Sequence, residues 1–284
     1  MTGTDPLEEC LQGRMTADLA IARLLLAGAT AEDIARQVFA IRQSGPAWAA
    51  LARAAADRPA LDRMRAMLDI AGVDHAGTTT AEAIARLFDR AVDVSPEAAV
   101  ALYSLGDAER LAAVTQDIVA WLEREALLAP GMDMLDLGCG IGRMAAAVAG
   151  TTRSVLGLDV SARMIQEARR RCAGLDTVRF LHTNGQDLAA VPDHAFDLVL
   201  AVDSFPYLVQ ARLAERHVAD AARVLRAGGV LVILNLSYRC DAQADQTDAQ
   251  TWARRYLFVM DQCGTTPFRL WDGQAFVLRR VAQG

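Results

Sequence analysis

The stretch MDMLDLGCGIGR (residues 132–143) decides the fold class of this 284-residue chain. Its apolar first half predicts a strand over Met132–Leu137, and the glycines that follow predict a tight turn into a helix from Arg143 to Ala149. Such a turn lets a ligand approach the backbone and the N-terminus of the helix. Asp136, at the end of the strand, suits a ligand that carries an ammonium group better than one that carries a pyrophosphate.

The spacing of the glycines argues against a dinucleotide site. A dinucleotide fingerprint is G-x-G-x-x-G, whereas here the third glycine, Gly142, comes one position early and Arg143 takes its place. An NAD-dependent enzyme is therefore the less favoured interpretation of the turn.

The chain after Met132 alternates short Val-, Leu- and Ile-rich runs with helical patterns, which predicts an α/β domain with a parallel sheet. After the first strand, the predicted strands are Ser154–Asp159, Val178–His182, Asp197–Val202 and Gly229–Leu236. Near the C-terminus, the runs Phe268–Trp271 and Ala275–Leu278 flank an Asp-Gly pair, which predicts a two-stranded antiparallel hairpin.

The first 106 residues carry no strand pattern. Thr30, Thr80 and Ser95 each stand shortly before an acidic residue and an apolar helical face, which is the signature of a helix N-terminus. We expect an all-α domain over residues 1–106 and the α/β domain over residues 107–284. The helical domain is expected to act either as a lid over a substrate pocket or as an oligomerisation or docking module.

The composition excludes several kinds of chemistry. All 29 basic residues are arginine, which removes the P-loop lysine, the kinase lysine and Schiff-base enzymes such as those that use pyridoxal phosphate. The five cysteines form no C-x-x-C pair and have no histidine at ligand spacing, so we expect neither a disulfide framework nor a metal site.

The charge and the hydropathy pattern predict where the protein works. The formal charge is −6, and the one run of basic residues, Arg169–Arg171, fits a solvated helix face, so a nucleic-acid partner is not favoured. No apolar run approaches the roughly 20 residues of a membrane span, and the N-terminus is acidic where a signal peptide is basic. We expect a cytoplasmic protein without a membrane partner, either a monomer or a homodimer.

Polar residues follow the ends of the next strands. Asp159 ends the second strand, where a carboxylate can accept both hydroxyls of a ribose, and TNGQDL (residues 183–188) follows the third as a polar turn able to contact an adenine. Because the carboxyl ends of parallel strands share one edge of the sheet, these features converge on one ligand site.

Five segments together resemble the class I S-adenosylmethionine-dependent methyltransferases of the small-molecule type: LDLGCGIGR (135–143), GLDVSARMI (157–165), NGQDL (184–188), FDLVLAVDSFPYL (196–208) and ARVLRAGGVLVI (222–233). The resemblance covers about residues 101–284. It implies a Rossmann-like, doubly wound, seven-stranded sheet in the order 3-2-1-4-5-7-6 with the last strand antiparallel. It also implies S-adenosylmethionine as cofactor, S-adenosylhomocysteine as product and no metal.

The resemblance places the cofactor contacts at the ends of the first four strands and on one tyrosine upstream. These residues are Tyr103, Asp136, Gly138, Cys139, Gly140, Gly142, Asp159, Val160, Met164, Asn184, Gly185, Gln186, Asp187 and Ala201. By the same resemblance, the first acid and the glycines face the methionine moiety and the second acid faces the ribose. Tyr103 packs over the cofactor or, alternatively, only within its helix.

The adenine end departs from the pattern of the family. Val160 and Met164 are expected to pack on the adenine ring. The acid that the family places against the adenine amino group is replaced by Asn184, so either that residue or Asp187 makes the contact.

The loop after the fourth strand is where this family meets its acceptor. Asp203 and Tyr207 are the candidate catalytic residues, able to accept a proton or to orient an amine or a hydroxyl, although Asp203 could instead cap the next helix. The candidate substrate contacts are Ser204, Phe205, Tyr207, Tyr238 and Arg239. The SFPY segment is similar to the N-P-P-Y pattern of amino methyltransferases, with Phe205 in place of the first proline.

The sequence therefore predicts methyl transfer to a small-molecule acceptor by in-line displacement. The alternatives are a protein or peptide methyltransferase, less favourably a nucleic-acid methyltransferase, or a protein that binds S-adenosylmethionine without turnover. The acceptor atom, whether O, N, C or S, is left open.

Overall fold

The computed structural model describes residues 5–41, 43–71, 79–239 and 241–281. Its contacts divide the chain into two compact units that no single cut along the sequence separates. We call them the helical unit (Met1–Val73, Arg90–Asp117 and Phe268–Asp272) and the sheet unit (Asp74–Asp89, Ile118–Pro267 and Gly273–Gly284).

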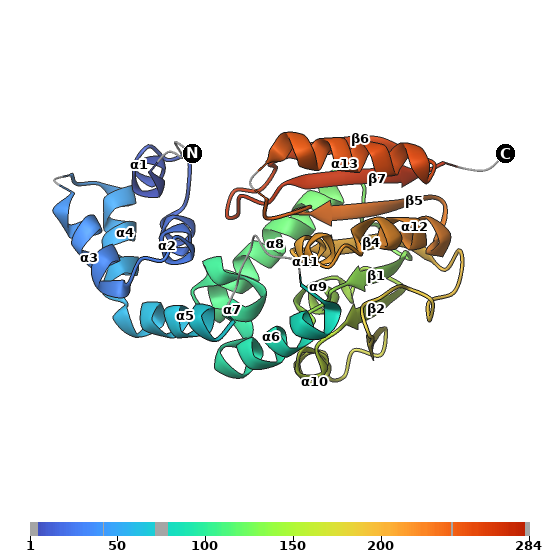
Figure 1. The fold of residues 1–284 in the computed structure, drawn as a ribbon, viewed down its shortest axis with the longest axis horizontal. Helices are drawn as coiled ribbons and strands as arrows, with labels where there is room; N and C mark the ends of the chain where they lie inside the picture. The colour runs from blue at the N-terminus through green and yellow to red at the C-terminus, as the bar shows by residue number, and fades with distance from the viewer. Residues whose placement is uncertain (1–4, 42, 72–78, 240, 282–284) are drawn as a thin grey trace. The chain divides into compact units, whose positions relative to one another are not determined.

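The sheet unit contains one seven-stranded sheet in the order β3-β2-β1-β4-β5-β7-β6 (Figure 1). The strands are β1 (Asp133–Leu137), β2 (Ser154–Asp159), β3 (Val178–His182), β4 (Phe196–Val202), β5 (Leu225–Leu234), β6 (Phe258–Thr265) and β7 (Ala275–Arg280). Strands β1 to β5 pair in parallel, whereas β7 runs antiparallel to both of its neighbours. The predicted strand order and the antiparallel last strand are confirmed.

The centre of the sheet is buried because β4 and β5 each contain a continuous apolar run. Along β5, every residue from Val230 to Leu234 is buried, and β4 buries all four residues from Leu198 to Ala201. The helices that cover the sheet are α9 (Arg143–Val148), α10 (Ala162–Arg171), α11 (Phe205–Gln210), α12 (Ala214–Val224) and α13 (Ala242–Arg255). Their connections bring the loops after β1, β2, β4 and β5 to the carboxyl edge of the parallel strands.

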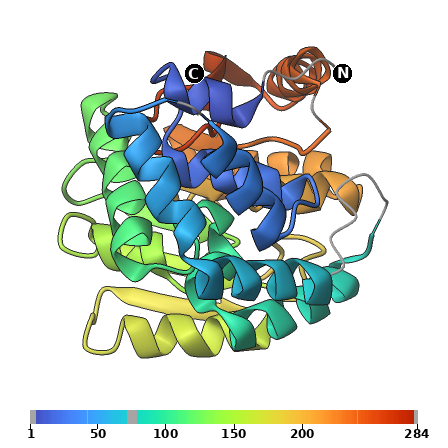
Figure 2. The same ribbon diagram turned by 90° about the vertical axis from the view of Figure 1, so that its left-hand side faces the viewer.

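The helical unit is built from amphipathic helices that begin at side-chain caps. Its helices are α1 (Pro6–Leu11), α2 (Ala17–Leu26), α3 (Ala31–Ala40), α4 (Pro46–Ala56), α5 (Arg58–Ala71), α7 (Pro96–Val100) and the short 3-10 helix η1 (Leu102–Ser104). Helix α2 packs against α1, α4 and α5, on the side that faces the viewer in Figure 2. Thr30 and Ser95 cap α3 and α7 as predicted.

Two helices run from one unit into the other. Helix α6 (Ala81–Val94) begins in the sheet unit, and helix α8 (Ala108–Arg124) ends in it. The predicted cap of α6 is present, since the N–H of Ala83 donates to Thr80 Oγ1 at 3.2 Å. Residues 79–89 therefore belong to the sheet unit, although the sequence groups them with the helical region.

The predicted hairpin over Phe268–Trp271 is wrong. The strand that pairs with β7 is β6, and residues 268–271 form no strand. Asp117 of α8 accepts the N–H groups of Arg269 and Leu270 at 2.9 and 3.2 Å, so these groups are not available to a sheet. Trp271 is buried and its ring lies 5.7 Å from that of Tyr103, a contact within the helical unit to which the segment belongs.

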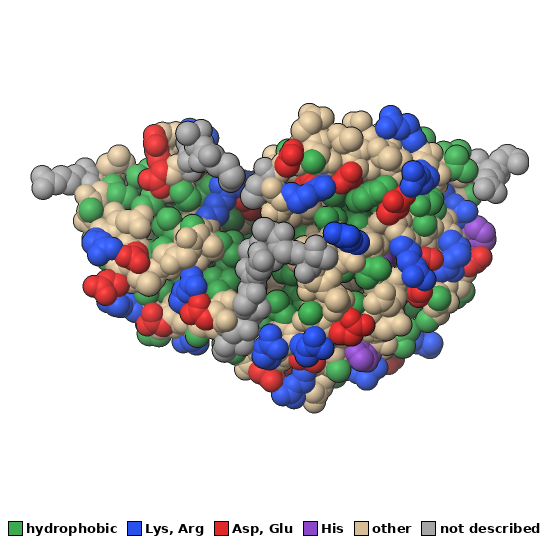
Figure 3. Space-filling model, in the orientation of Figure 1, with side chains coloured by type: hydrophobic (Ala, Val, Ile, Leu, Met, Phe, Trp, Pro, Cys, Tyr) green, Lys and Arg blue, Asp and Glu red, His purple; other side chains and the backbone are tan. Residues whose placement is uncertain are grey.

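Surface charge, helix hydropathy and the arrangement of possible metal ligands can be compared with the partners considered from the sequence. On the face shown in Figure 3, arginine and acidic side chains are interspersed. Among the helices of the described residues, none is both long enough and apolar enough to cross a membrane. A search of the same residues finds no group of three His, Cys, Asp or Glu side chains that could hold a metal ion.

Candidate functional site

The turn between β1 and α9 needs glycine for conformation and for space. Gly138, Gly140 and Gly142 all have positive φ, at 75°, 51° and 74°. A Cβ on Gly138 would lie 2.3 Å from Cβ of Ser204, and one on Gly142 would lie 3.0 Å from Cβ of Ala168. The turn is therefore packed closely against the loop after β4 and against helix α10, with Cys139 buried within it.

Asp136, at the end of β1, is a buried ionisable side chain with one oxygen that accepts no hydrogen bond. It is 2% exposed, and its Oδ2 atom is buried with no hydrogen-bond partner. Burial raises the pKa of this carboxyl to about 7, the Arg143 guanidinium opposes the rise, and the neighbouring Asp159 adds to it. A buried acceptor without a donor destabilises the folded protein. A ligand that donates a hydrogen bond to this oxygen would remove that penalty and would therefore bind favourably.

Asp159 at the end of β2 joins the first two loops of the site. Its Oδ2 accepts the N–H of Gly140 and its Oδ1 accepts the N–H of Ser161, both at 2.8 Å. Burial raises the pKa of this carboxyl, although the backbone donors lower it. Each carboxylate oxygen keeps a second lone pair after these bonds, so the side chain can still accept hydroxyl groups.

The loop after β3 packs on the loop after β2. Gly185 has a φ of 69°, and a Cβ there would lie 2.4 Å from Cγ1 of Val160. Asn184 Oδ1 accepts the N–H of Gln186 at 3.0 Å, so this side chain also shapes its own turn. Met164, one turn into α10, is buried at 1% exposure.

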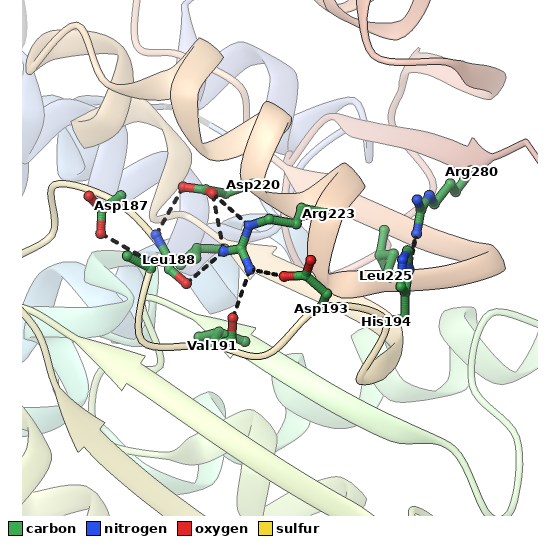
Figure 4. Close-up of polar contacts among 10 residues, drawn as sticks. Asp187, Leu188, Val191, Asp193, His194, Asp220, Arg223, Leu225 and Arg280 are labelled. Atoms are coloured by element: carbon green, nitrogen blue, oxygen red, sulfur yellow. Dashed lines mark hydrogen bonds and ion pairs between the residues drawn. The ribbon is translucent and has the colours of Figure 1, made fainter.

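An arginine on α12 anchors the chain that follows this loop (Figure 4). Arg223 donates to the carbonyl oxygens of Leu188 and Val191, both at 2.8 Å, and pairs with Asp193 and Asp220. Asp187 is also held toward α12, because its Oδ2 pairs with Arg216 at 2.6 Å. The Asp187 carboxylate therefore already has a charged partner, whereas the hydrogen bond described for the Asn184 side chain is with the backbone of its own turn.

A second polar group lies at the ends of β4 and β5. Asp203 and Asn235 both have positive φ, at 56° and 65°, a strained conformation for residues other than glycine. Asp203 Oδ1 accepts from Asn235 Nδ2 at 2.7 Å and from the Tyr238 hydroxyl at 3.3 Å. Asn235 is in turn held by the N–H of Gln274, which donates to its Oδ1 at 2.9 Å.

Three aromatic rings flank this carboxylate. The Tyr207 ring lies 5.0 Å from that of Phe88 and 5.7 Å from that of Tyr238, both nearly perpendicular to it. Burial, and then the charge of Asp203, raise the pKa of both tyrosine hydroxyls. The phenols therefore stay protonated near neutral pH, and the Tyr238 hydroxyl donates a hydrogen bond to Asp203.

The sequence analysis did not identify Phe88 or Asn235. Asn235 directly follows the buried run of β5, and a polar residue at that position is a usable signal. Phe88 lies on helix α6 with no local feature that separates it from a core residue, and only its long-range contact with Tyr207 identifies it.

Several residues predicted as acceptor contacts are placed in structural roles. Ser204 Oγ donates to the carbonyl oxygen of Leu137 at 2.5 Å, against the glycine turn. Phe205 is 0% exposed and its ring lies 6.3 Å from that of Trp252 in the core. Arg239 is paired with acidic residues of α13, Asp245 and Asp248.

Two further residues predicted to contact the cofactor are Tyr103 and Ala201. Tyr103 belongs to the helical unit, where its ring lies 5.7 Å from that of Trp271. Ala201 is buried in β4 and pairs with Ile233 of β5.

Comparison with known proteins identifies the domain that holds these loops. Residues 134–229 match the family model described as a methyltransferase domain. A demethylmenaquinone methyltransferase of Tropheryma whipplei is 40% identical over 108 residues, which are 38% of this chain and 43% of that protein. A ubiquinone biosynthesis O-methyltransferase of Cereibacter sphaeroides is 30% identical over 154 residues, 52% of this chain and 60% of that protein. The chain spans less than two thirds of the length of these curated relatives.

Solved structures share the fold. A phosphoethanolamine N-methyltransferase of Haemonchus contortus matches with a TM-score of 0.54 and 20% identity, over 72% of this chain and 50% of that one. The [4+2]-cyclase SpnF matches with a TM-score of 0.53 and 17% identity, over 73% of this chain and 98% of that one. Because a cyclase and a methyltransferase both have this fold, the fold alone does not specify the reaction.

Proposed function

We propose that this chain, whose residues 134–229 match a methyltransferase domain, is a class I S-adenosylmethionine-dependent methyltransferase that transfers a methyl group to a small organic acceptor. The observation that carries the proposal is a pair of carboxylates, the buried Asp136 and the half-buried Asp159, at the ends of adjacent parallel strands beside the glycine turn.

The residues of the site fit S-adenosylmethionine. The orphaned Oδ2 of Asp136 would accept from the ammonium of the methionine moiety, which also favours the charged form of that carboxyl. Asp159 would accept the ribose hydroxyls with its remaining lone pairs, and Val160 would pack on the adenine. Asn184 is the better candidate for the adenine amino group, because Asp187 is paired with Arg216.

The cofactor supplies an electrophilic methyl group on a sulfonium centre. The chain therefore has to orient the acceptor, exclude water and, for an O–H or N–H acceptor, remove a proton. We assign the removal of that proton to Asp203, and the orientation of the acceptor atom to the protonated hydroxyls of Tyr207 and Tyr238; their mutual contacts support this assignment.

Local charge favours an acceptor group that is neutral or cationic. The contacts at the ends of β4 and β5 include one carboxylate, one amide, two protonated phenols and the Phe88 ring. Arg239, which follows β5, is paired with Asp245 and Asp248. A hydroxyl or amine donor is therefore a better partner for Asp203 than a carboxylate or a phosphate.

Calorimetric titration of S-adenosylmethionine and S-adenosylhomocysteine tests the cofactor. We expect wild-type protein to bind both with micromolar affinity, about −8 kcal/mol, and Asp159→Ala to lose measurable binding. NAD should not bind. Asp261→Ala is the matched control, because Asp261 is a strand acid of β6 that pairs with Arg279, and it should bind as wild type does.

Detection of S-adenosylhomocysteine in incubations with phenols, quinols and amines then tests the reaction. Formation of the product with at least one acceptor, reduced by Asp203→Asn, supports methyl transfer. Tight cofactor binding without product from any acceptor would instead favour the alternative of a protein that binds the cofactor without turnover.

A further inference from the structure

Asp89 of helix α6 completes the cap of another helix, α10. Its Oδ1 accepts the Ser161 hydroxyl at 2.6 Å and the N–H of Arg163 at 3.1 Å. Ser161 is the N-cap of α10, and its Oγ also accepts the N–H of Met164 at 3.0 Å. The bond between Asp89 and Ser161 joins residues 72 positions apart, and so ties an N-terminal segment to the loop after β2.

The same hydrogen bonds continue to the carboxylate assigned to the ribose. The N–H of Ser161 donates to Asp159 Oδ1, and Asp159 Oδ2 accepts from Gly140, both at 2.8 Å. An unbroken series of bonds thus runs from Asp89 through Ser161 and Asp159 to the glycine turn. Ser161 is 0% exposed, so the folded protein supplies the partner of its hydroxyl, and that partner is Asp89.

Helix α6 contacts the loops after β3 and β4 as well. The Cβ of Ala81 lies 3.4 Å from the position that a Cβ on Gly185 would take, at the loop assigned to the adenine. The ring of Phe88, next to Asp89 in sequence, lies 5.0 Å from that of Tyr207. Residues 81–89 therefore contact loops assigned to both the cofactor and the acceptor.

We propose that Asp89 is a positioning residue of the cofactor site, which acts through Ser161 to hold Asp159 in the orientation that accepts the ribose hydroxyls. This inference rests on the proposed function, because the ribose belongs to the proposed cofactor. Without Asp89, the buried Ser161 hydroxyl turns toward another acceptor, and the loop that carries Asp159 loses its fixed geometry.

Binding of S-adenosylhomocysteine to Asp89→Ala tests the proposal. Loss of one net hydrogen bond predicts a dissociation constant roughly 3- to 10-fold higher than that of wild type. Asp89→Asn keeps an acceptor oxygen and should lie between the two. Arg86→Ala removes an exposed charge from the same helix and should bind as wild type does.

A ligand without ribose hydroxyls separates positioning from general weakening of the fold. The 2′,3′-dideoxy analogue of S-adenosylhomocysteine cannot use Asp159, so wild type and Asp89→Ala should bind it equally. An equal loss with both ligands, or no loss with either, overturns the proposal. Absence of binding to wild-type protein would instead refute the proposed function, which keeps the two failures distinct.

Discussion

The two ends of strand β1 treat an aspartate in opposite ways. At the amino end, Asp133 accepts from the Ser154 hydroxyl at 2.7 Å and pairs with Arg153 and Arg226, which hold the pKa of its carboxyl well below the usual range. At the carboxyl end, three residues on, Asp136 has an oxygen without a partner and a pKa raised to about 7. One end of the strand satisfies its carboxylate within the fold, and the other leaves it for a ligand.

The contrast separates the two edges of the sheet: the amino ends of the strands carry contacts that stabilise the fold, and the carboxyl ends carry the proposed site. Charge pairs at the amino ends of β1, β2 and β5 bind strands together, with Arg226 contacting both Asp133 and Asp197. At the carboxyl ends, Asp203 and Asn235 have positive φ, and Asp136 has a buried oxygen without a hydrogen-bond partner. Unfavourable local energies at that edge are therefore the feature that marks the site.

The largest expected effect is on the pH dependence of the unliganded protein. Because the pKa of Asp136 rises from 3.8 to about 7 on folding, the folded state binds the extra proton, and stability falls as pH rises from about 4 to 7. A shift of this size corresponds to about 4 kcal/mol. Asp136→Asn removes the ionisation and should flatten this fall, as measured by urea unfolding at pH 5 and pH 7.5.

The same variant should lose affinity for S-adenosylhomocysteine while it gains stability at pH 7.5, since Asn cannot pair with an ammonium group. Saturating ligand should stabilise wild type more than Asp136→Asn. If the variant is less stable than wild type at pH 7.5, the carboxyl has a partner that offsets its burial, and the comparison between the two aspartates fails.

The second effect concerns the other end of the strand. Asp133→Ala leaves Arg226 and the Ser154 hydroxyl without their shared acceptor, and we expect a loss of about 2–3 kcal/mol in the free energy of unfolding at pH 7. The sign of the pH dependence is opposite to that of Asp136. A lowered pKa stabilises the fold above pH 4, and this contribution disappears as the carboxyl is protonated at lower pH.

Ligand binding supplies the control for this substitution. Folded Asp133→Ala should bind S-adenosylhomocysteine with the affinity of wild type, because its contacts lie at the opposite end of the strand. A marked loss of affinity in calorimetry would mean that the two ends of β1 are coupled.

The sequence predicts the cofactor half of the site better than the acceptor half. Glycines with forced conformations and acids at strand ends are local signals, and they identify Asp136, Gly138 and Asp159 where the structure places them together. The acceptor half depends on contacts between distant segments. Phe88 and Asp89 reach the site only because helix α6 packs on loops 70 or more residues away, which no local pattern encodes.

The error at the C-terminus has a similar cause. An Asp-Gly pair between two apolar runs is a strong hairpin signal, but here the first run uses its N–H groups and its aromatic rings in contacts with α8 and η1. The strand that does pair with β7 at this edge is β6. It exposes both Val259 and Asp261, and its register with β7 shifts between Met260 and Gln262 and again between Cys263 and Thr265. Long-range contacts of residues 268–271 therefore outweigh the local preference of the Asp-Gly pair for a hairpin.

The smallest expected effect separates the two arginines that meet Asp133. Arg153 has 60% of its side chain exposed and Arg226 has 35%, and only Arg226 also reaches a second carboxylate, at 2.7 Å from Asp197. Exposed pairs contribute little because solvent screens them, so Arg153→Ala should leave the free energy of unfolding nearly unchanged, whereas Arg226→Ala should lower it by about 1 kcal/mol. Urea unfolding of both variants, and of each combined with Asp133→Ala, measures the two coupling energies. A larger coupling for Arg153 than for Arg226 would show that hydrogen-bond geometry outweighs burial at this end of β1.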